Sequence, residues 1–98
     1  MLVHGNKDNF DSLVSEGVVV VDFFANWCGP CRMLGPVIDE VAKGNTEYKF
    51  YKLNVDDAEE VAIKFGIMSI PCILIFENGE LKNKLVGFRS KSEWEKEL

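Results

Sequence analysis

Several features that would assign this chain to another class of protein are missing from its sequence. No apolar run approaches the roughly 20 residues that a membrane-spanning helix needs, and the first ten residues have neither the charged start nor the apolar core of a signal peptide. Basic residues are few, since 11 Lys and Arg face 16 Asp and Glu, and the two signs are interspersed. We therefore expect a cytoplasmic protein that binds neither nucleic acid nor membrane.

Cysteine is also scarce. The chain has three cysteines, of which Cys28 and Cys31 stand two residues apart and Cys72 stands alone. A framework of structural disulfides is not expected in a reducing cytosol, where a C-x-x-C pair is more often catalytic or metal-binding.

The 98 residues suffice for one domain, residues 1–98, and no repeat, low-complexity tract or linker interrupts them. Nothing in the sequence requires more than a monomer. The apolar and turn residues predict strands and helices that alternate along the chain, at residues 1–4, 8–17, 18–25, 29–44, 48–55, 56–66, 72–76, 81–88 and 90–98. This order predicts an α/β fold, with a mixed β-sheet of about five strands and helices on both faces.

Short local signals predict where the elements begin and end. Gly17 is a plausible C-cap for the first helix, and Asp56 or Asp57 is expected to cap the third. Asn78-Gly79 predicts a two-residue type I′ hairpin. Ser90 is expected to cap the last helix.

The sequence WCGPC directly follows the most apolar strand, where the next helix begins. At a helix N-terminus the unpaired N–H groups favour a thiolate, so Cys28 is expected to be a nucleophile toward disulfides. Cys31, one turn further on, lies close enough to resolve a mixed disulfide. Pro30 is tolerated in a first turn and stiffens it, whereas Pro36 falls inside the helix and is expected to kink it.

Asp22 interrupts the apolar strand at residues 18–25. A buried carboxylate is costly and its pKa is raised, so it can exchange protons near neutral pH. We hypothesise that Asp22 accepts the proton of Cys31 when Cys31 attacks a mixed disulfide. Lys52, on the same strand face as Phe50, is expected to bury its stem and partly balance the charge of Asp22. The alternative is a strand-end acid that turns into solvent.

Zinc binding is the competing interpretation of the cysteine pair. Cys72 and His4 could complete a set of four ligands, but their spacing matches no standard zinc pattern. The sequence therefore predicts redox chemistry and no metal site.

The segment SIPC contains two further features. Pro71 must stand at the first position of a strand or at a bend, and its peptide bond could be trans or cis. Cys72 is expected to be a small buried hydrophobe, with a regulatory thiol as the minor alternative.

The stretch VVVVDFFANWCGPCRMLGP resembles the thioredoxin family, and the resemblance covers nearly the whole chain. Besides WCGPC, the family's order and spacing are matched by the acid before the motif, the proline eight residues after Cys28, and the segments KLNVD, IP, NGE and VGF.

The resemblance implies a thioredoxin fold and a protein-disulfide reductase and electron carrier that cycles through a Cys28–Cys31 disulfide without a bound cofactor. Electrons would come from a thioredoxin reductase, and the substrates would be disulfide-containing proteins. Gly29 and Pro30 would tune the redox potential. The resemblance also implies a cis peptide bond at Ile70-Pro71 and a flat docking surface for protein substrates, formed by Trp27, Gly66, Ile70, Pro71 and Gly87.

Two departures from the family pattern are Cys72, where Thr is usual, and Phe24, where Trp or Tyr is usual. Neither touches the catalytic pair. The competing functions are a disulfide isomerase or oxidase, which often has His in place of Pro30, and a thioredoxin-fold binding subunit of a larger complex. A metal or iron–sulfur holder is a third class.

Overall fold

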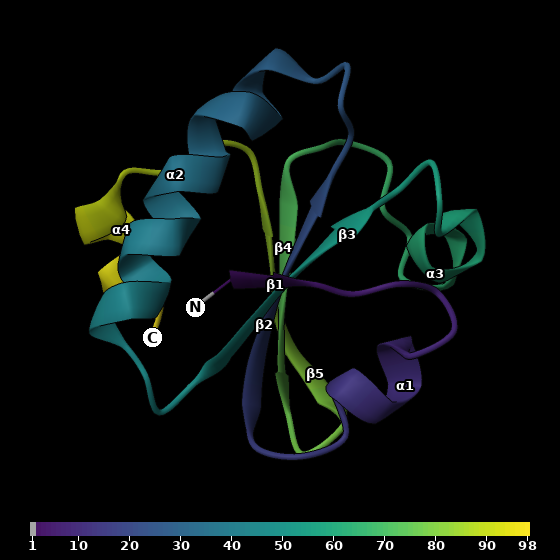
Figure 1. Cartoon of the computed structure of the whole chain (residues 1–98), viewed down its shortest axis with the longest axis horizontal. Coiled ribbons are helices and arrows are strands. Elements are labelled where there is room, and N and C mark those ends of the chain that lie inside the picture. Colours follow the sequence, from purple (N-terminus) through teal and green to yellow (C-terminus); the bar gives the residue numbers. More distant parts are fainter. Residues whose placement is uncertain (1) are drawn as a thin grey trace.

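A computed structural model describes residues 2–98 of the chain. Its central sheet has five strands in the order β1-β3-β2-β4-β5 (Figure 1). Strand β2 pairs in parallel with β3 and antiparallel with β4, so the sheet is mixed, as expected. The elements are β1 (Leu2–His4), α1 (Phe10–Leu13), β2 (Val18–Phe24), α2 (Gly29–Gly44), β3 (Lys49–Asn54), α3 (Glu59–Lys64), β4 (Cys72–Glu77), β5 (Glu80–Val86) and α4 (Lys91–Glu97).

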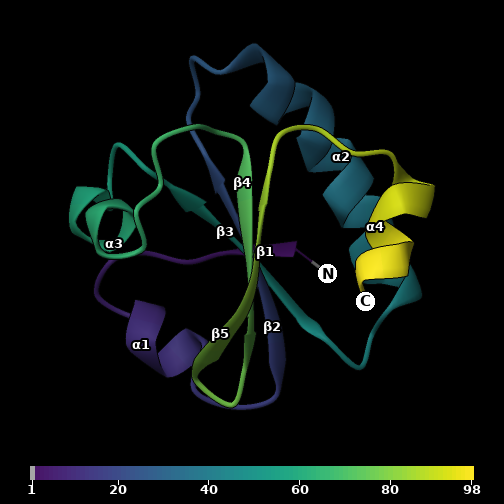
Figure 2. The same ribbon diagram turned by 180° about the vertical axis from the view of Figure 1, so that it is seen from behind.

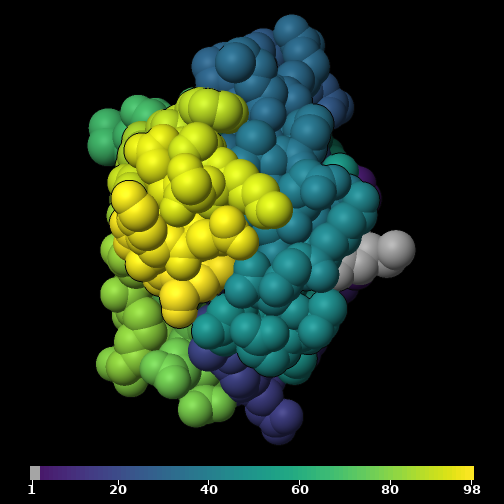
Figure 3. All heavy atoms as spheres, turned by 90° about the vertical axis from the view of Figure 1, so that its left-hand side faces the viewer, coloured from purple at the N-terminus to yellow at the C-terminus, as the bar shows by residue number. Residues whose placement is uncertain are grey.

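Helices cover both faces of the sheet, which confirms the predicted α/β architecture. Helices α1 and α3 lie on one side and α2 and α4 on the other, and the view from behind shows the same two layers (Figures 1 and 2). Figure 3 faces the second layer, where α4 packs beside the long helix α2. Within residues 2–98, no helix is both long and apolar enough to cross a bilayer.

Strand β2 is buried on both faces and contributes to two hydrophobic cores. Val19, Val21 and Phe23 pack in the core under α1 and α3. Val20 packs on the opposite face, under α2 and α4. Since side chains alternate along a strand, Asp22 belongs to that second face, beside the start of α2.

Two predicted helix boundaries were wrong. Helix α1 ends at Leu13 and not at Gly17, because the hydroxyl of Ser15 bonds the carbonyl of Ser12 and the chain leaves the helix there. Gly17 instead adopts a φ of 72° in the turn into β2, where its N–H donates to the side chain of Asn78.

Helix α3 begins at Glu59, and neither aspartate caps it. Its N-cap is Ala58, without a side-chain hydrogen bond. The preceding residues form a separate turn, in which the side chain of Asn54 accepts the N–H of Asp56 at 2.9 Å. This turn uses the local hydrogen-bonding groups before the helix starts, and it leaves the carboxylate of Asp56 free to bind elsewhere.

Other local predictions were confirmed. Asn78 and Gly79 have φ values of 50° and 85°, as a type I′ turn requires, and they join β4 to β5. Ser90 and Glu93 form a capping box at the start of α4. Pro36 lies inside α2 as expected, and the kink that it was expected to cause stays a prediction.

Candidate active site

The N-terminus of α2 holds the cysteine pair. Cys28 is the N-cap residue, and its Sγ accepts the backbone N–H of Cys31 at 3.2 Å. Pro30 occupies the first turn, where its missing N–H has no helical partner to lose. The two cysteines form a disulfide, with their Cα atoms 5.2 Å apart. The pair is thus placed as the sequence predicted, at the junction of β2 and α2.

Both cysteines are only 5 % exposed, and they form a small apolar cluster with Ala25. Ile70 packs against this cluster, and its carbonyl oxygen lies 3.9 Å from the Sγ of Cys28. The side chain of Trp27, immediately before the pair, is 68 % exposed. The pair is thus preceded in the chain by an exposed indole, and the backbone of Ile70 lies beside the sulfur of Cys28.

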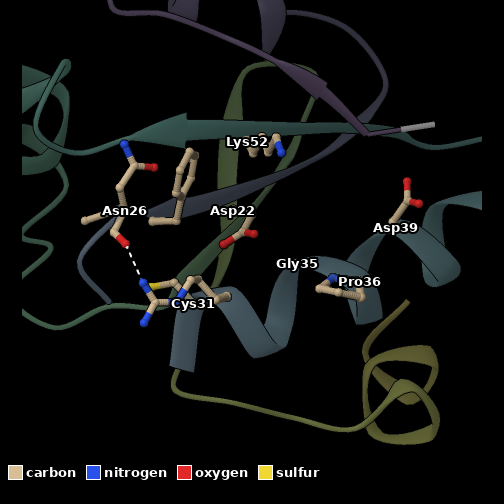
Figure 4. Close-up of a pocket in the computed structure, with 10 residues that line it drawn as sticks. Asp22, Asn26, Cys31, Gly35, Pro36, Asp39 and Lys52 are labelled. Atoms are coloured by element: carbon tan, nitrogen blue, oxygen red, sulfur yellow. Dashed lines mark hydrogen bonds between the residues drawn. The ribbon is translucent and has the colours of Figure 1, made fainter. Parts of the chain in front are cut away.

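A cleft of about 580 Å³ opens beside the pair, between α2 and the strands β2 and β3 (Figure 4). Asp22 and Cys31 both line it, one from the strand and the other from the helix. Its remaining lining residues are Phe24, Ala25, Asn26, Arg32, Gly35, Pro36, Asp39 and Lys52. The cleft gives the buried acid and the buried sulfur a shared route to solvent.

Asp22 is only 2 % exposed, so it does not turn into solvent. Burial raises the pKa of its carboxyl from the ordinary value of 3.8 to about 7, and the nearby Lys52 cation opposes part of this rise. Oδ1 of Asp22 has no hydrogen-bond partner within the part of the chain that the structure describes. A carboxyl with this pKa exchanges its proton readily at neutral pH.

Lys52 lies directly opposite Asp22 in the parallel register of β2 and β3. Its ammonium is 5.8 Å from the centre of the Phe24 ring, and its side chain is half-buried at the edge of the cleft. This position fits the expected partial burial of the Lys52 stem, and its cation lowers the pKa of Asp22 in the expected direction, while a catalytic role of Lys52 stays a prediction.

Of the residues expected to bind substrate, Ile70 contacts the cysteine cluster directly. The Ile70-Pro71 peptide bond is cis. Gly87 donates its N–H to the carbonyl of Pro71 at 2.8 Å, which joins the end of β5 to the start of β4. Gly66 lies four positions before Ile70 and directly after Phe65, the C-cap of α3, with a φ of 63°.

Three residues near the site were missed by the sequence reasoning. The carboxylate of Asp56 accepts the indole N–H of Trp27 at 3.0 Å, and Arg32 donates to the carbonyl of Asn26 at 3.0 Å (Figure 4). Met68 is 96 % exposed, two positions before Ile70. The first contact joins two turns 29 positions apart, and the second joins helix α2 to the loop before it, so neither follows a local sequence pattern.

The third cysteine is separate from the pair. Cys72 is fully buried in the core under α1 and α3. Burial raises the pKa of its thiol, the Lys84 cation opposes the rise, and the Asp22 carboxylate adds to it. Its expected role as a buried hydrophobe fits this position. Among residues 2–98, no three His, Cys, Asp or Glu side chains are grouped to hold a metal ion.

The sequence model of the family described as Thioredoxin matches residues 1–98. The chain belongs to the thioredoxin family. It is 45 % identical to thioredoxin of Mycoplasmoides gallisepticum over 89 residues, which cover 90 % of the chain and 89 % of that protein. It is 52 % identical to a chloroplastic M-type thioredoxin of Pisum sativum over 85 residues, which cover 84 % of the chain but 49 % of that longer protein.

The fold agrees with this membership. The crystal structure of Malassezia sympodialis thioredoxin superimposes with a TM-score of 0.89 at 32 % identity, covering 98 % of the chain and 88 % of that structure. Like its family, the chain is a thiol–disulfide oxidoreductase with a redox-active Cys28–Cys31 pair and protein-disulfide reductase activity.

Proposed function

We propose that this thioredoxin-family chain is a general protein-disulfide reductase and electron carrier, in which Cys28 attacks the substrate and Cys31 resolves the intermediate. The position of Cys28 at the N-cap of the 16-residue helix α2 carries this proposal. There its sulfur accepts a backbone N–H, and the helix N-terminus stabilises negative charge. Cys31, unlike Cys28, lines the cleft together with Asp22, the proposed proton acceptor.

The reaction is two successive thiol–disulfide exchanges. The thiolate of Cys28 attacks one sulfur of the substrate disulfide, forms a mixed disulfide and releases the other sulfur as a thiolate, which takes up a proton. Cys31 then loses its proton and attacks the Sγ of Cys28. The Cys28–Cys31 disulfide forms, the second substrate thiolate leaves, and the substrate has gained two electrons.

Asp22 accepts the proton of Cys31 in the second exchange, directly or through water in the cleft. Both residues line that cleft, and a pKa of about 7 lets Asp22 be ionised before the step and protonated after it. Lys52 assists by keeping part of the Asp22 population ionised. Gly29 and Pro30, which lie between the sulfurs, tune the redox potential.

Protein substrates dock on the surface formed by Trp27, Gly66, Ile70, Pro71 and Gly87. An extended substrate chain pairs with the backbone of Ile70, next to the sulfur of Cys28. The docked substrate disulfide then reaches Cys28 without a rearrangement of the active site.

A thioredoxin reductase returns two electrons to the oxidised pair. The chain works as one monomeric domain, residues 1–98, with no bound cofactor or metal. Its place is the cytoplasm, because a reductant of protein disulfides needs a compartment where thiols are kept reduced.

Trapping the intermediate tests the order of attack. Cys31→Ser should accumulate a mixed disulfide on Cys28 that is visible by mass spectrometry, whereas Cys28→Ser should accumulate none. The reverse pattern would exchange the two roles.

The pH dependence of the second exchange tests the role of Asp22. In Asp22→Asn, the rate of this exchange should no longer rise with pH near 7, and a pH profile like that of the wild-type protein would remove Asp22 from the mechanism.

The reduction potential separates the reductase from the isomerase or oxidase alternative. A value near about −270 mV supports the reductase, and a value of about −180 to −120 mV supports the alternative. It is measured by equilibrating the pair with a dithiol buffer and counting free thiols by mass.

A further inference from the structure

Helix α3 ends in a backbone arrangement that leaves two carbonyl groups facing outward. The N–H of Gly66 donates to the carbonyl of Ile63 at 3.1 Å, and the N–H of Ile67 donates to the carbonyl of Ala62 at 2.9 Å. With Gly66 at a φ of 63°, this is a Schellman motif. The motif satisfies the carbonyls of Ala62 and Ile63, but those of Phe65 and Gly66 need partners from outside the helix.

Lys84 supplies that partner from a distant part of the chain. Its ammonium donates to the carbonyl of Gly66 at 2.8 Å and to that of Phe65 at 3.2 Å. Lys84 lies on the edge strand β5, opposite Leu74 of β4 in the antiparallel register. Leu74 belongs to the core under α1 and α3, so Lys84 projects toward the α3 face of the sheet.

The position of this cation also suits the charge of the helix end. The C-terminus of a helix carries a partial negative charge, which a cation in contact with the last carbonyls stabilises. A lysine on another element thereby ties the end of α3 to β5. In Figure 2 the chain leaves α3 and loops directly into β4, and this loop is the segment that contains Ile70 and Pro71.

We propose that Lys84 is a positioning residue for protein-disulfide reduction, which holds the Gly66–Pro71 loop in the place that substrate docking requires. The loop is held at its far end by the N–H of Gly87, which donates to Pro71, and by packing of the adjacent Ile70 on the cysteine pair. Lys84 anchors its beginning. This inference rests on the proposed docking surface and adds the residue that orients it.

The decisive experiment compares Lys84→Met with Lys82→Met, the change of the other lysine of β5. Within the part of the chain that the structure describes, the only ion pair of Lys82 is with Glu80 of its own strand. Lys82→Met removes the same charge from β5 and therefore serves as the control. Amide hydrogen exchange of the oxidised protein is measured first. Steady-state reduction of a protein disulfide, insulin, and of a small disulfide, oxidised glutathione, is then measured with a thioredoxin reductase in excess as the electron donor.

In Lys84→Met, exchange at the amides of Gly66 and Ile67 should accelerate about five- to tenfold while exchange in β2 stays unchanged. KM for insulin should rise about threefold, whereas KM for oxidised glutathione and kcat for both substrates should change little. Lys84→Arg should restore both values because it keeps the donors, and Lys82→Met should move neither.

Unchanged exchange at Gly66 and Ile67 would overturn the proposal, as would faster exchange with an unaltered KM for insulin. Acceleration throughout the sheet would reduce Lys84 to a general stabilising residue and would also overturn it. Ile70→Ala separates this proposal from the docking surface itself. If Ile70→Ala leaves KM for insulin unchanged, the surface is wrong; if it raises KM and Lys84→Met does not, only the role of Lys84 is wrong.

Discussion

Replacing Asp22 by Asn should stabilise the protein at neutral and alkaline pH. The carboxyl is buried in the second core face, and its pKa rises from 3.8 to about 7 on folding. Each pH unit of difference corresponds to about 1.4 kcal/mol, so ionising this group costs the folded state about 4 kcal/mol. An amide of the same shape carries no charge and avoids this cost.

The sign of the effect depends on pH. Well below pH 3.8 the carboxyl is protonated in both the folded and the unfolded state, and Asp22→Asn should change the free energy of unfolding little. As pH rises from about 4 to about 7, the unfolded state releases this proton first and the wild-type protein loses stability relative to the variant. Above about pH 7 the full difference of about 4 kcal/mol should be present.

Urea unfolding of the oxidised protein at pH 4 and pH 8, followed by circular dichroism, measures this difference. Asp39→Asn is the matched control, because Asp39 lines the same cleft but its side chain is 43 % exposed and pairs with Lys43 at 3.5 Å. Its effect should stay within about 0.5 kcal/mol at both pH values. A difference for Asp22→Asn that is equal at pH 4 and pH 8 would refute the argument from burial.

Three smaller predictions concern local features. Ser90→Ala should lower the free energy of unfolding by about 1 kcal/mol through loss of the capping box, and Ser92→Ala by clearly less, in urea titrations. Asn78→Ala should lower the free energy of unfolding more than Asn78→Gly does. Both variants lose the hydrogen bond from the N–H of Gly17 to the Asn78 side chain, but only Ala is strained, by about 1–2 kcal/mol, at a φ of 50°. Equal losses would contradict the turn geometry. Cys72 should resist iodoacetamide in the native oxidised protein and react on unfolding, as mass spectrometry can show; rapid native labelling would disprove its burial.

The sequence predicted the redox site well because its signals are local. Cys28 and Cys31 are three positions apart, and the apolar strand before them and the helical periodicity after them determine where a helix N-terminus must fall. The Asn78-Gly79 turn and the Ser90 cap were equally local, and both were confirmed. Asp22 stood out because an acid within an apolar strand is rare enough to require an explanation.

The boundaries of α1 and α3 could not be predicted in the same way. At Gly17 a glycine that suits a helix end serves instead in a turn that bonds to Asn78, 61 positions away. At Asp56 a residue that suits a helix start binds the indole of Trp27. In both cases the residue could take two local roles, and a hydrogen bond to a residue from another part of the chain determines which one it takes.

The sequence by itself determined the order of strands and helices, the position of the cysteine pair at a helix start and the presence of an acid nearby. Only the tertiary structure decided which groups meet: Lys52 opposite Asp22, Ile70 against Cys28, and Lys84 at the end of α3. The physical reason is the range of the interactions. Periodicity, capping and turn preferences act over a few residues, whereas strand register and side-chain contacts are settled only when the sheet has assembled and both cores are packed.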